Sequence, residues 1–473
     1  MLGWWRDRAE AAVITTDLCW SGAELLERAA GAARHLSAIA TDTRAVPALL
    51  TSSPAAFAYV IGGADCERPI APLGPRLTAH ELHPCIENLG SDVLLVEPEF
   101  IPLGRQLASS SDCELVVVDI PPRSKDTLDL APAADDVAFV LHTSGTTGTP
   151  KPVAYRQAQL AQRTQVNVDL CSLGPRSVYA TASPFHHIAG FGNYAVALAA
   201  GAASVPVSRF TVEAWKGLAA FGTTHALTVP TVLDMLLDEG VLALPDLRVL
   251  QYGASPIHPV TLRRVLDALP DVDLVNIFGQ TEGSPITCLT AQDHRRIVID
   301  GRDDLLESVG RAALGVELRI EGADASGVGE VVGRAPHFFR PDPDGWLRTG
   351  DMGRLDDEGH LFLSGRRGDK IIRGGENIYP VEVEQVLEHH PDVREAAVVG
   401  VPDRRWGEIV RAVVVLEDPT QPPEFDDLQA HVRAQLAGFK VPAEWVVADE
   451  LPRNAAGKLL RRRLLVDPQW ANQ

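Results

Sequence analysis

Residues 143–151, TSGTTGTPK, combine small hydroxyl side chains, glycines and one lysine, a composition suited to binding an anion. Glycines let backbone amides approach phosphate oxygens, hydroxyls add hydrogen-bond donors, and Lys151 adds positive charge. The run directly follows an apolar segment, where a flexible linker is uncommon. It is not a Walker A loop, because Pro150 and Pro152 flank the lysine. We therefore predict a phosphate-binding loop.

Lysine is scarce in this chain, whereas arginine is plentiful. A lysine that occurs where arginine is the usual cation indicates a need for its compact ammonium group. Two lysines stand in segments that could do chemistry: Lys151 in the Thr/Gly loop, and Lys458 in a Gly-Lys turn near the C-terminus. The lysines are at positions 125, 151, 216, 370, 440 and 458.

Strand-like and helix-like segments alternate over residues 15–300, which predicts a doubly wound α/β architecture. Residues 22–39 have the apolar spacing of an amphipathic helix, and further helices are predicted at 157–170 and 259–269. The Thr/Gly loop should then join a buried strand to a helix, where open α/β sheets bind ligands. The Val-rich runs that predict buried strands of a largely parallel sheet are residues 93–97, 114–120 and 137–143.

Two further patterns follow this α/β region. Residues 301–365 alternate short strands with Gly and Asp turns, and the DDEGH turn at 356–360 is typical of a β-hairpin. We predict an N-terminal domain of residues 1–366, which includes this β-rich subdomain, and a small α+β C-terminal domain of residues 367–473. The C-terminal helices are predicted at 381–390 and 426–438, and the C-terminal strands at 394–402 and 408–417.

The composition excludes several classes of function. The chain has 473 residues, 45% of them apolar and 22% charged, which is ordinary for a protein of two or three domains. A net charge of −20 argues against a nucleic-acid or anionic-membrane surface, because both need clustered Lys and Arg. No apolar run is long enough to span a bilayer, and the N-terminus does not resemble a signal peptide. The scattered cysteines show neither zinc-ligand nor disulfide spacing, so we expect a cytoplasmic location.

Five segments, in order along the chain, resemble the motifs of the adenylate-forming superfamily, and the chain is similar to its acyl- and aryl-CoA synthetase branch. The similarity covers roughly residues 15–465. It implies a large N-terminal domain that binds ATP and an acid, and a small mobile C-terminal domain that swings between two catalytic orientations. The segments are TSGTTGTPK (143–151), FGQTE (278–282), GWLRTGD (345–351), GRRGDKIIRGGENIYPVEVE (365–384) and LPRNAAGK (451–458).

The resemblance implies a ligase that uses ATP and Mg²⁺ to activate a carboxylic acid as acyl-AMP, with release of pyrophosphate, and then transfers the acyl group to coenzyme A. Both reactants of the first step are anions, so the site must supply positive charge and fixed dipoles. By the same resemblance, the Thr/Gly loop binds the terminal phosphates of ATP. Its residues are Thr143, Ser144, Gly145, Thr146, Thr147, Gly148 and Lys151.

The FGQTE segment implies a metal site and nucleotide contacts. Glu282 resembles the glutamate that binds Mg²⁺, although alone it could be a solvated loop acid, and Thr281 resembles the threonine that contacts the α-phosphate. Phe278 stands where tyrosine is more usual, and its ring face can still stack on adenine. The residues implied to surround the nucleotide are Gly253, Ala254, Ser255, Asn276, Phe278, Gly279 and Gln280.

Asp351 is implied to accept hydrogen bonds from both ribose hydroxyls, and the alternative is a simple turn residue. Arg366 matches an arginine that contacts the nucleotide. Lys458 matches the catalytic lysine that bridges the substrate carboxylate and the α-phosphate, and the alternative is a surface lysine at a helix end. Gly374 and Gly375 match the loop along which the pantetheine arm of coenzyme A passes.

His187, in SPFHHIAGFGN, matches a position that lines the acid pocket. A core histidine is the alternative, although two adjacent histidines cannot both face inward on a strand. No Asp stands nearby to pair a substrate ammonium group, so we expect an acid without an α-amino group. Four glycines should leave room for a bulky apolar or aromatic acid. They are Gly190, Gly192, Gly279 and Gly283.

These inferences favour an acid–CoA ligase whose partners are a small carboxylic acid, ATP and CoA. Acyl-AMP ligases that stop before CoA carry an inserted segment that residues 345–369 lack. One alternative is a stand-alone adenylation enzyme that loads a carrier protein. Another is a nucleotide-binding scaffold without catalysis. Monomer and homodimer are both left open.

Overall fold

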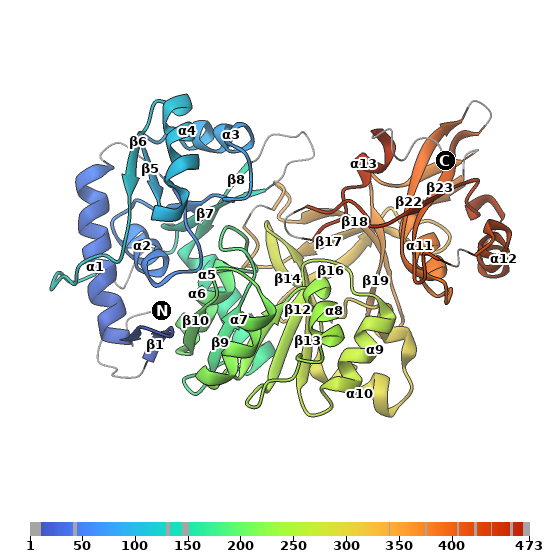
Figure 1. The fold of residues 1–473 in the computed structure, drawn as a ribbon, viewed down its shortest axis with the longest axis horizontal. Coiled ribbons are helices and arrows are strands. Elements are labelled where there is room, and N and C mark those ends of the chain that lie inside the picture. The colour runs from blue at the N-terminus through green and yellow to red at the C-terminus, as the bar shows by residue number, and fades with distance from the viewer. Residues whose placement is uncertain are drawn as a thin grey trace. The chain divides into compact units, whose positions relative to one another are not determined.

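The computed structural model forms two compact units (Figure 1). Unit 1 comprises Met1–Glu317 and Arg334–Leu347, and unit 2 comprises Leu318–Gly333 and Arg348–Gln473. The predicted domain boundary at residue 366 stays a prediction. The residues that the structure describes are 11–40, 45–128, 133–143, 151–339, 341–373, 376–403, 406–420, 423–436, 438–454 and 457–466.

The larger sheet of unit 1 has a parallel centre, as the alternation of strands and helices predicted. Strands β10, β9, β11, β12 and β13 pair in parallel, whereas β14 and β15 add antiparallel at one edge. The strand order in the described residues is β15 (Arg311–Ala312), β14 (Gly283–Leu289), β13 (Asp273–Gln280), β12 (Val249–Gly253), β11 (His225–Thr228), β9 (Val178–Thr181), β10 (Ala203–Pro206), β1 (Ala11–Ile14) and β2 (Cys19–Ser21).

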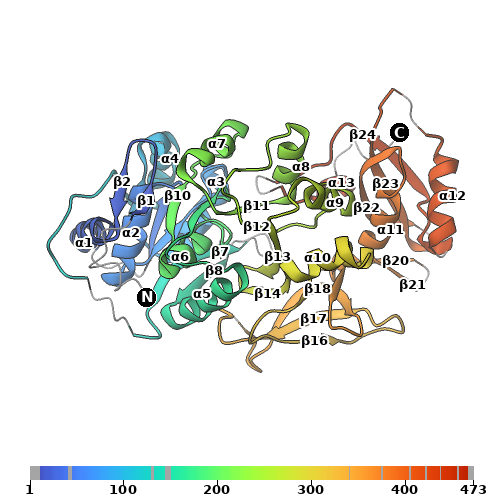
Figure 2. The ribbon, with the colours of Figure 1, turned by 90° about the horizontal axis from the view of Figure 1, so that it is seen from below.

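Helices cover both faces of this sheet (Figure 2). Leu250 and Leu274 pack in one hydrophobic cluster with residues of α8 and α9, whereas Val249 and Val275 pack in another with residues of α5 and α6. Successive strand residues therefore face opposite helix layers, which defines a doubly wound sheet. The helices are α5 (Gln157–Cys171), α6 (Phe191–Ala200), α7 (Val212–Gly217), α8 (Pro230–Asp238), α9 (Pro259–Ala268) and α10 (Ala291–Ile299). The predicted helices at 157–170 and 259–269 are confirmed.

A second, four-stranded parallel sheet in unit 1 has the order β4-β3-β5-β6 in the described residues. Its strands are β3 (Val46–Leu49), β4 (Ile70–Pro72), β5 (Val93–Val96) and β6 (Glu114–Val117), and its helices are α1 (Gly22–Ile39), α2 (Pro54–Asp65), α3 (Ala79–Leu89) and α4 (Ile101–Ser111). The predicted helix at 22–39 is confirmed, and the side chain of Ser21 caps it by accepting from the amide of Glu24.

Two of the strand predictions need correction. Residues 114–120 form an edge strand that ends at Val117, and its first and last residues are exposed because one side has no neighbouring strand. Residues 137–143 form β7 (Val137–Thr143), which pairs antiparallel with β8 (Lys151–Arg156) rather than in a parallel sheet. The Thr/Gly loop therefore connects a hairpin, and β8 separates it from α5.

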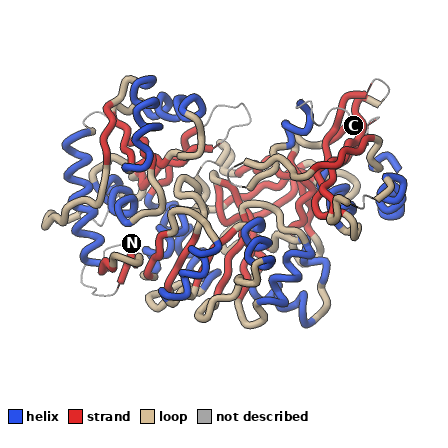
Figure 3. Tube along the Cα trace, in the orientation of Figure 1, coloured by secondary structure: helices blue, strands red, loops and turns tan. Residues whose placement is uncertain are grey.

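Unit 2 contains two β-sheets, whose strands are red in Figure 3, and the second sheet is mixed because β24 pairs in parallel with β23. The first contains β16 (Glu317–Glu321), β17 (Gly329–Arg334), β18 (Leu347–Leu355) and β19 (Leu361–Arg366), and the predicted hairpin turn at 356–360 joins the last two. The second contains β20 (Ile371–Arg373), β21 (Glu376–Ile378), β22 (Val393–Asp403), β23 (Gly407–Leu416) and β24 (Glu444–Ala448). Its helices are α11 (Pro380–Glu388), α12 (Phe425–Gln435) and α13 (Arg461–Val466). The predicted C-terminal helices and strands are thus confirmed.

Within the ranges that the structure describes, no helix has both the length and the apolar composition needed to cross a membrane.

Gly62 tests the close approach of α1 and α2. A Cβ atom at Gly62 would lie 2.3 Å from the carbonyl oxygen of Ala29, inside α1. We expect Gly62→Ala to lower the thermal unfolding midpoint, because overpacking costs about 1–3 kcal/mol and outweighs the gain of about 1 kcal/mol in helix propensity. Gly174→Ala is the control, since a Cβ there meets nothing within 4 Å. Equal midpoints for the two variants would contradict this account of the packing.

Candidate active site

The predicted phosphate loop starts and ends at one strand pair. Thr143 is the last residue of β7, and Lys151, the first residue of β8, is its cross-strand partner. The loop therefore leaves and returns at the same end of the hairpin. The other predicted loop residues lie outside the described residues, as do the two glycines predicted to contact CoA: Ser144, Gly145, Thr146, Thr147, Gly148, Gly374 and Gly375.

Tyr155 of β8 fixes the turn that carries Thr281 and Glu282. Its hydroxyl donates to the backbone carbonyl of Thr281, and its ring centroid lies 4.6 Å from that of Phe139 and 3.7 Å from that of Phe339. The amide of Phe339 donates to the carbonyl of Glu282 at 2.7 Å. The turn is thus held from two sides. Tyr155 was not predicted from the sequence, because a buried aromatic residue on a strand is indistinguishable from an ordinary core residue.

The Glu282 carboxylate fits a magnesium site. The side chain is half-buried, and within the described part of the chain it has no hydrogen-bond or ion-pair partner. Mg²⁺ is usually bound by one or two carboxylates together with substrate phosphates and water. A carboxylate with no partner among the described residues can serve in that way, and the metal would there neutralise phosphate charge.

The carboxyl ends of β12 and β13 form the predicted adenine site. A Cβ at Gly253 would lie 2.4 Å from the carbonyl oxygen of Ile277, so only glycine allows these two strands to approach so closely. Ala254 follows in the left-handed region at φ 68°, a strained conformation of the kind found at ligand sites. The Asn276 side chain is 5% exposed, and its Oδ1 has no hydrogen-bond partner among the described residues.

An unpaired buried acceptor fits the exocyclic amine of adenine, because the amine would supply the missing hydrogen bond. Asn276 is opposite Tyr252 in the β12–β13 register, one pair before Gly253. The rest of the predicted segment continues along β13 to its half-buried end, through Phe278, Gly279 and Gln280, and Ser255 follows Ala254 in the chain.

His187 lies in a turn between β9 and α6, not on a strand. Its amide donates to the carbonyl of Pro184 at 3.0 Å, and its own carbonyl accepts from Gly190 at 2.9 Å. The rings of His186 and His187 are 4.2 Å apart, and burial lowers the pKa of both. Because the two histidines lie in a turn, the alternation of side chains along a strand does not decide which of them faces inward.

The four glycines do not leave empty space, which corrects the argument for a bulky acid. A Cβ at Gly190 would lie 2.1 Å from the Pro184 carbonyl oxygen, and a Cβ at Gly192 would lie 2.4 Å from Ile188 Cδ1. At Gly279 and Gly283 the nearest atoms would be 2.8 Å and 2.6 Å away. Neighbouring protein atoms already fill the volume beside each glycine.

Unit 2 brings Asp351 and Arg366 together. They are cross-strand partners in β18 and β19, and the Nε of Arg366 lies 2.7 Å from Oδ1 of Asp351. Asp351 is 8% exposed, and burial raises its pKa to about 6, although Arg366 and Lys458 act in the opposite direction. One oxygen of this carboxylate is thus held by a cation, and the group needs further donors to stay ionised at lower pH.

Lys458 lies within electrostatic range of the same pair. Partial burial, with Arg366 as the next cause, lowers the pKa of Lys458, whereas Asp351 and Asp369 favour its charged form. Its backbone is fixed by Asn454, whose side chain accepts from the Lys458 amide at 2.9 Å. The predicted ribose acceptor, nucleotide arginine and catalytic lysine therefore form one cluster within unit 2.

Arg461 anchors the segment that carries Lys458. Its guanidinium donates to both carboxylate oxygens of Glu384 in α11, with the Nη2 bond at 2.7 Å, and to the carbonyl of Val398 at 2.8 Å. The Nε lies 3.5 Å from Asp369. This half-buried fork restrains α13 three residues after the catalytic candidate, which makes Arg461 a positioning residue. This positioning role of Arg461 was not predicted from the sequence.

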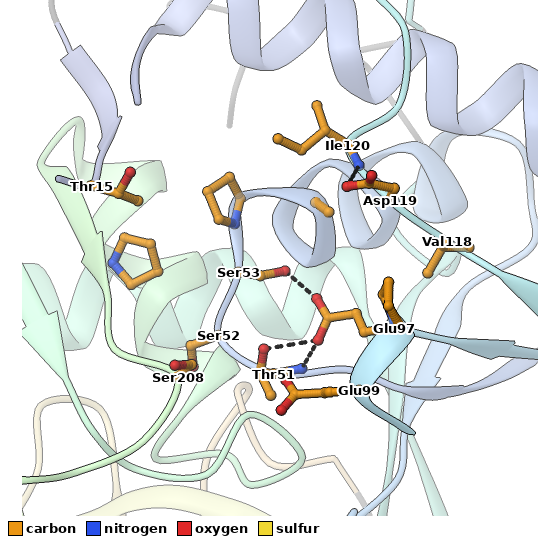
Figure 4. Close-up of a pocket in the computed structure, with 14 residues that line it drawn as sticks. Thr15, Thr51, Ser52, Ser53, Glu97, Glu99, Val118, Asp119, Ile120 and Ser208 are labelled. Carbon is orange, nitrogen blue, oxygen red and sulfur yellow. Dashed lines mark hydrogen bonds between the residues drawn. The ribbon is translucent and has the colours of Figure 1, made fainter. Parts of the chain in front are cut away.

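A further pocket of unit 1 lies where β3 and β5 end, and it was not predicted (Figure 4). Its volume is about 500 Å³. Glu97 follows β5 there, and its Oε2 accepts from the amide and hydroxyl of Thr51 at 2.8 Å each, while Ser53 donates to Oε1. Burial raises the pKa of Glu97, and these hydrogen bonds oppose the shift. The carboxylate therefore braces the turn into α2.

Family models match most of the chain. The model described as AMP-binding enzyme matches residues 5–341, and the AMP-binding enzyme C-terminal domain matches residues 382–458. The chain is 33% identical over 449 residues to the fatty acid–[acyl-carrier-protein] ligase ScoC of Streptomyces coeruleorubidus, covering 86% of this chain and 83% of that protein. It is 34% identical over 479 residues to indoleacetate–CoA ligase of Aromatoleum aromaticum, covering 92% and 90%.

A solved structure agrees with these matches. The amide bond synthetase McbA from Marinactinospora thermotolerans superimposes with a TM-score of 0.86 at 29% identity, over 96% of both chains. The fold and the family matches therefore define an ATP-dependent, AMP-forming ligase. Ligases of this kind use ATP, Mg²⁺ and CoA. The chain belongs to the adenylate-forming superfamily, in its acyl/aryl-CoA synthetase branch.

Tyr155→Phe should impair catalysis without unfolding the protein. Removal of the hydroxyl leaves the Thr281 carbonyl without its donor, and we expect kcat/KM for ATP to fall about tenfold as the turn loosens. Tyr59→Phe is a matched control, because it removes a hydroxyl bonded to Nδ1 of His35 at 2.8 Å in another part of unit 1. Equal losses in pyrophosphate release for the two variants would contradict the assigned role.

Asp351 should make ATP binding pH-dependent. Because its pKa is about 6, the carboxyl becomes protonated below that pH and loses acceptor capacity for ribose hydroxyls. We expect the KM for ATP to rise as the pH falls from about 8 to about 5. In Asp351→Asn the KM should be raised at every pH, with no step in that interval. A wild-type KM that stays constant across the interval would rule this out.

Proposed function

We propose that the protein joins a carboxylic acid without an α-amino group to the thiol of CoA. In the first step, a carboxylate oxygen attacks the α-phosphorus of ATP, and pyrophosphate leaves as acyl-AMP forms. In the second step, the CoA sulfur attacks the acyl carbonyl carbon, loses its proton, and AMP leaves. The observation that carries the proposal is the cluster of Lys458, Asp351 and Arg366 within unit 2.

Each candidate group has a distinct role in the first step. Thr143 and Lys151, with the loop between them, bind the terminal phosphates, and the backbone turn held by Tyr155 presents Thr281 to the α-phosphate. Glu282 binds the magnesium ion. Fixed dipoles and cations lower the barrier here because they need no reorganisation as charge moves toward the leaving pyrophosphate.

Lys458 supplies the charge that lets two anions react. An ammonium group near both the carboxylate and the α-phosphate offsets their repulsion most strongly in the transition state, where they are closest. Arg461 restrains the backbone of this segment, so the lysine side chain is positioned without a large ordering cost during the reaction.

The acceptor is proposed to be CoA rather than a carrier protein. Only the five residues 356–360 separate β18 from β19, so this hairpin carries no inserted segment. Carrier-protein loading is the second candidate, because one relative of 33% identity is named as a ligase of an acyl carrier protein. A nucleotide-binding scaffold without catalysis is the third.

The acid is proposed to have an apolar or aromatic body and no α-amino group. His187 and His186 are kept neutral by burial, and the segment around them, SPFHHIAGFGN, contains no acidic residue. An ammonium group on the substrate would find no counter-ion in this segment. Apolar neighbours such as Phe185 and Ile188 suit a hydrocarbon or ring.

A panel of carboxylic acids with ATP and Mg²⁺ tests the proposal by pyrophosphate release, followed by addition of CoA and detection of thioester by mass. Thioester formation supports the CoA ligase. Pyrophosphate release without thioester favours carrier-protein loading, and ATP binding without turnover of any acid favours the scaffold.

Lys458→Ala should separate the two steps. We expect adenylation to fall by about 100-fold or more, because an electrostatic contact to the transition state is lost. Thioester formation from supplied acyl-AMP should fall much less. Lys216→Ala, which changes an exposed lysine of α7, is the control. Equal losses in both steps would contradict the role assigned to Lys458.

A further inference from the structure

Helix α5 buries an arginine whose only hydrogen-bond acceptors in the described residues are neutral. Arg163 is 2% exposed. Its Nη1 donates to the carbonyl of Gly192 at 2.7 Å, and its Nη2 donates to Oδ1 of Asn193 at 2.7 Å. The Nε has no partner among the described residues. Two of the five N–H groups are therefore used, and the Nε edge is unsatisfied.

The charge of Arg163 has no counter-ion in the part of the chain that the structure describes. Burial lowers the pKa of Arg163 to about 10, so the guanidinium is still charged at neutral pH. The titratable groups that act on it are Tyr155, Tyr179 and Cys171. Burial raises the pKa of each of these, that of Cys171 to about 12, so all three are neutral. Burying an unpaired cation costs several kcal/mol, and buried charges are ordinarily paired.

The guanidinium lies against the segment predicted to line the acid pocket. Gly192 and Asn193 form the first turn of α6, directly after the turn that contains His187. A Cβ at Gly192 would lie 3.7 Å from Nη1 of Arg163 and 2.4 Å from Ile188. Asn193 also donates to the carbonyl of Ala189 at 3.3 Å. Through Gly192 and Asn193, Arg163 is therefore connected to Ile188 and Ala189, the two residues that directly follow His187.

A second unsatisfied group marks the same segment. Ser183 is 7% exposed, and its hydroxyl has no hydrogen-bond partner among the described residues. It stands four residues before His187, at the start of the turn that leads into α6. Buried polar atoms without partners are rare. Here one of them lies on this segment and the other, Nε of Arg163, belongs to a side chain that contacts the end of the segment, which fits groups that a ligand completes.

We propose that the acid carries a second carboxylate and that Arg163 binds it. The Nε–H and a remaining Nη–H of an arginine form a fork that matches the two oxygens of a carboxylate. The first carboxylate of the substrate reacts with ATP, while the second provides the counter-ion that Arg163 lacks. Arg163 is then a specificity-determining residue. This inference rests on the proposed function, because it names the class of acid that the same site ligates.

Matched pairs of acids test the inference. Each pair has equal length and differs by a terminal carboxylate in place of a methyl group, for example terephthalate with 4-methylbenzoate and adipate with hexanoate. We expect wild-type kcat/KM for pyrophosphate release to favour the dicarboxylate by about 10- to 100-fold, the value of a charged hydrogen bond. In Arg163→Met, which removes the charge and keeps the volume, this ratio should fall to about one.

Asn193→Asp provides an independent variant with an intact arginine. It places a carboxylate on the side chain that now accepts from Nη2 of Arg163, and so supplies an internal counter-ion. We expect the ratio of kcat/KM for the dicarboxylate to that for the monocarboxylate to fall as in Arg163→Met. The unfolding midpoint should rise, since a buried charge becomes paired. Because Asn193→Asp retains the guanidinium, it keeps the test decisive even where Arg163→Met does not fold.

The outcomes separate this inference from the function on which it rests. Turnover confined to monocarboxylic acids, or equal loss for both members of a pair in Arg163→Met, overturns the role of Arg163 and leaves the ligase intact. Absence of pyrophosphate release with every acid of both classes overturns the proposed function itself. A dicarboxylate preference that both variants remove supports the inference.

Discussion

The ion pair between Asp351 and Arg366 is the interaction on which the proposed chemistry of unit 2 depends. It is fixed by the register of β18 and β19, in which the two residues are direct partners. A slip of one residue between the two strands would place the two side chains on opposite faces of the sheet. Lys458 interacts electrostatically with the same two residues, because Arg366 lowers its pKa and Asp351 raises it. The hairpin register therefore sets the charges around the catalytic candidate, while Arg461 holds the backbone near it.

The sequence was sufficient for most helices and for the β18–β19 hairpin, because their signals are local. Apolar spacing and turn residues decide α1, α5, α9 and the β18–β19 turn with little help from distant residues. The pairing of β7 was predicted wrongly because it is not a local property. A Val-rich run looks the same whether its neighbour is a parallel strand or the returning arm of a hairpin. Only the position of β8 distinguishes them.

Motif order located the candidate site, but it could not supply the residues that support it. Tyr155 and Arg461 act through other residues, and neither type is unusual at its position in the chain. The prediction that four glycines leave room for a bulky acid was wrong for a related physical reason. A missing side chain shows that space is needed, and the sequence does not tell whether a ligand or the protein itself fills that space. At Gly190 and Gly192 the backbone and Ile188 fill it.

Arg163 illustrates why a protein would retain an unfavourable group in its interior. A single Asp or Glu among its neighbours would pair the charge and stabilise unit 1, yet both of its acceptors are neutral. Such an internal partner would also occupy the fork and remove its capacity to bind an anion. Stability and recognition therefore make opposite demands on the same guanidinium, as is common at binding sites. The aromatic and aliphatic residues packed around α5 and α6 contribute burial free energy that can offset the desolvation cost.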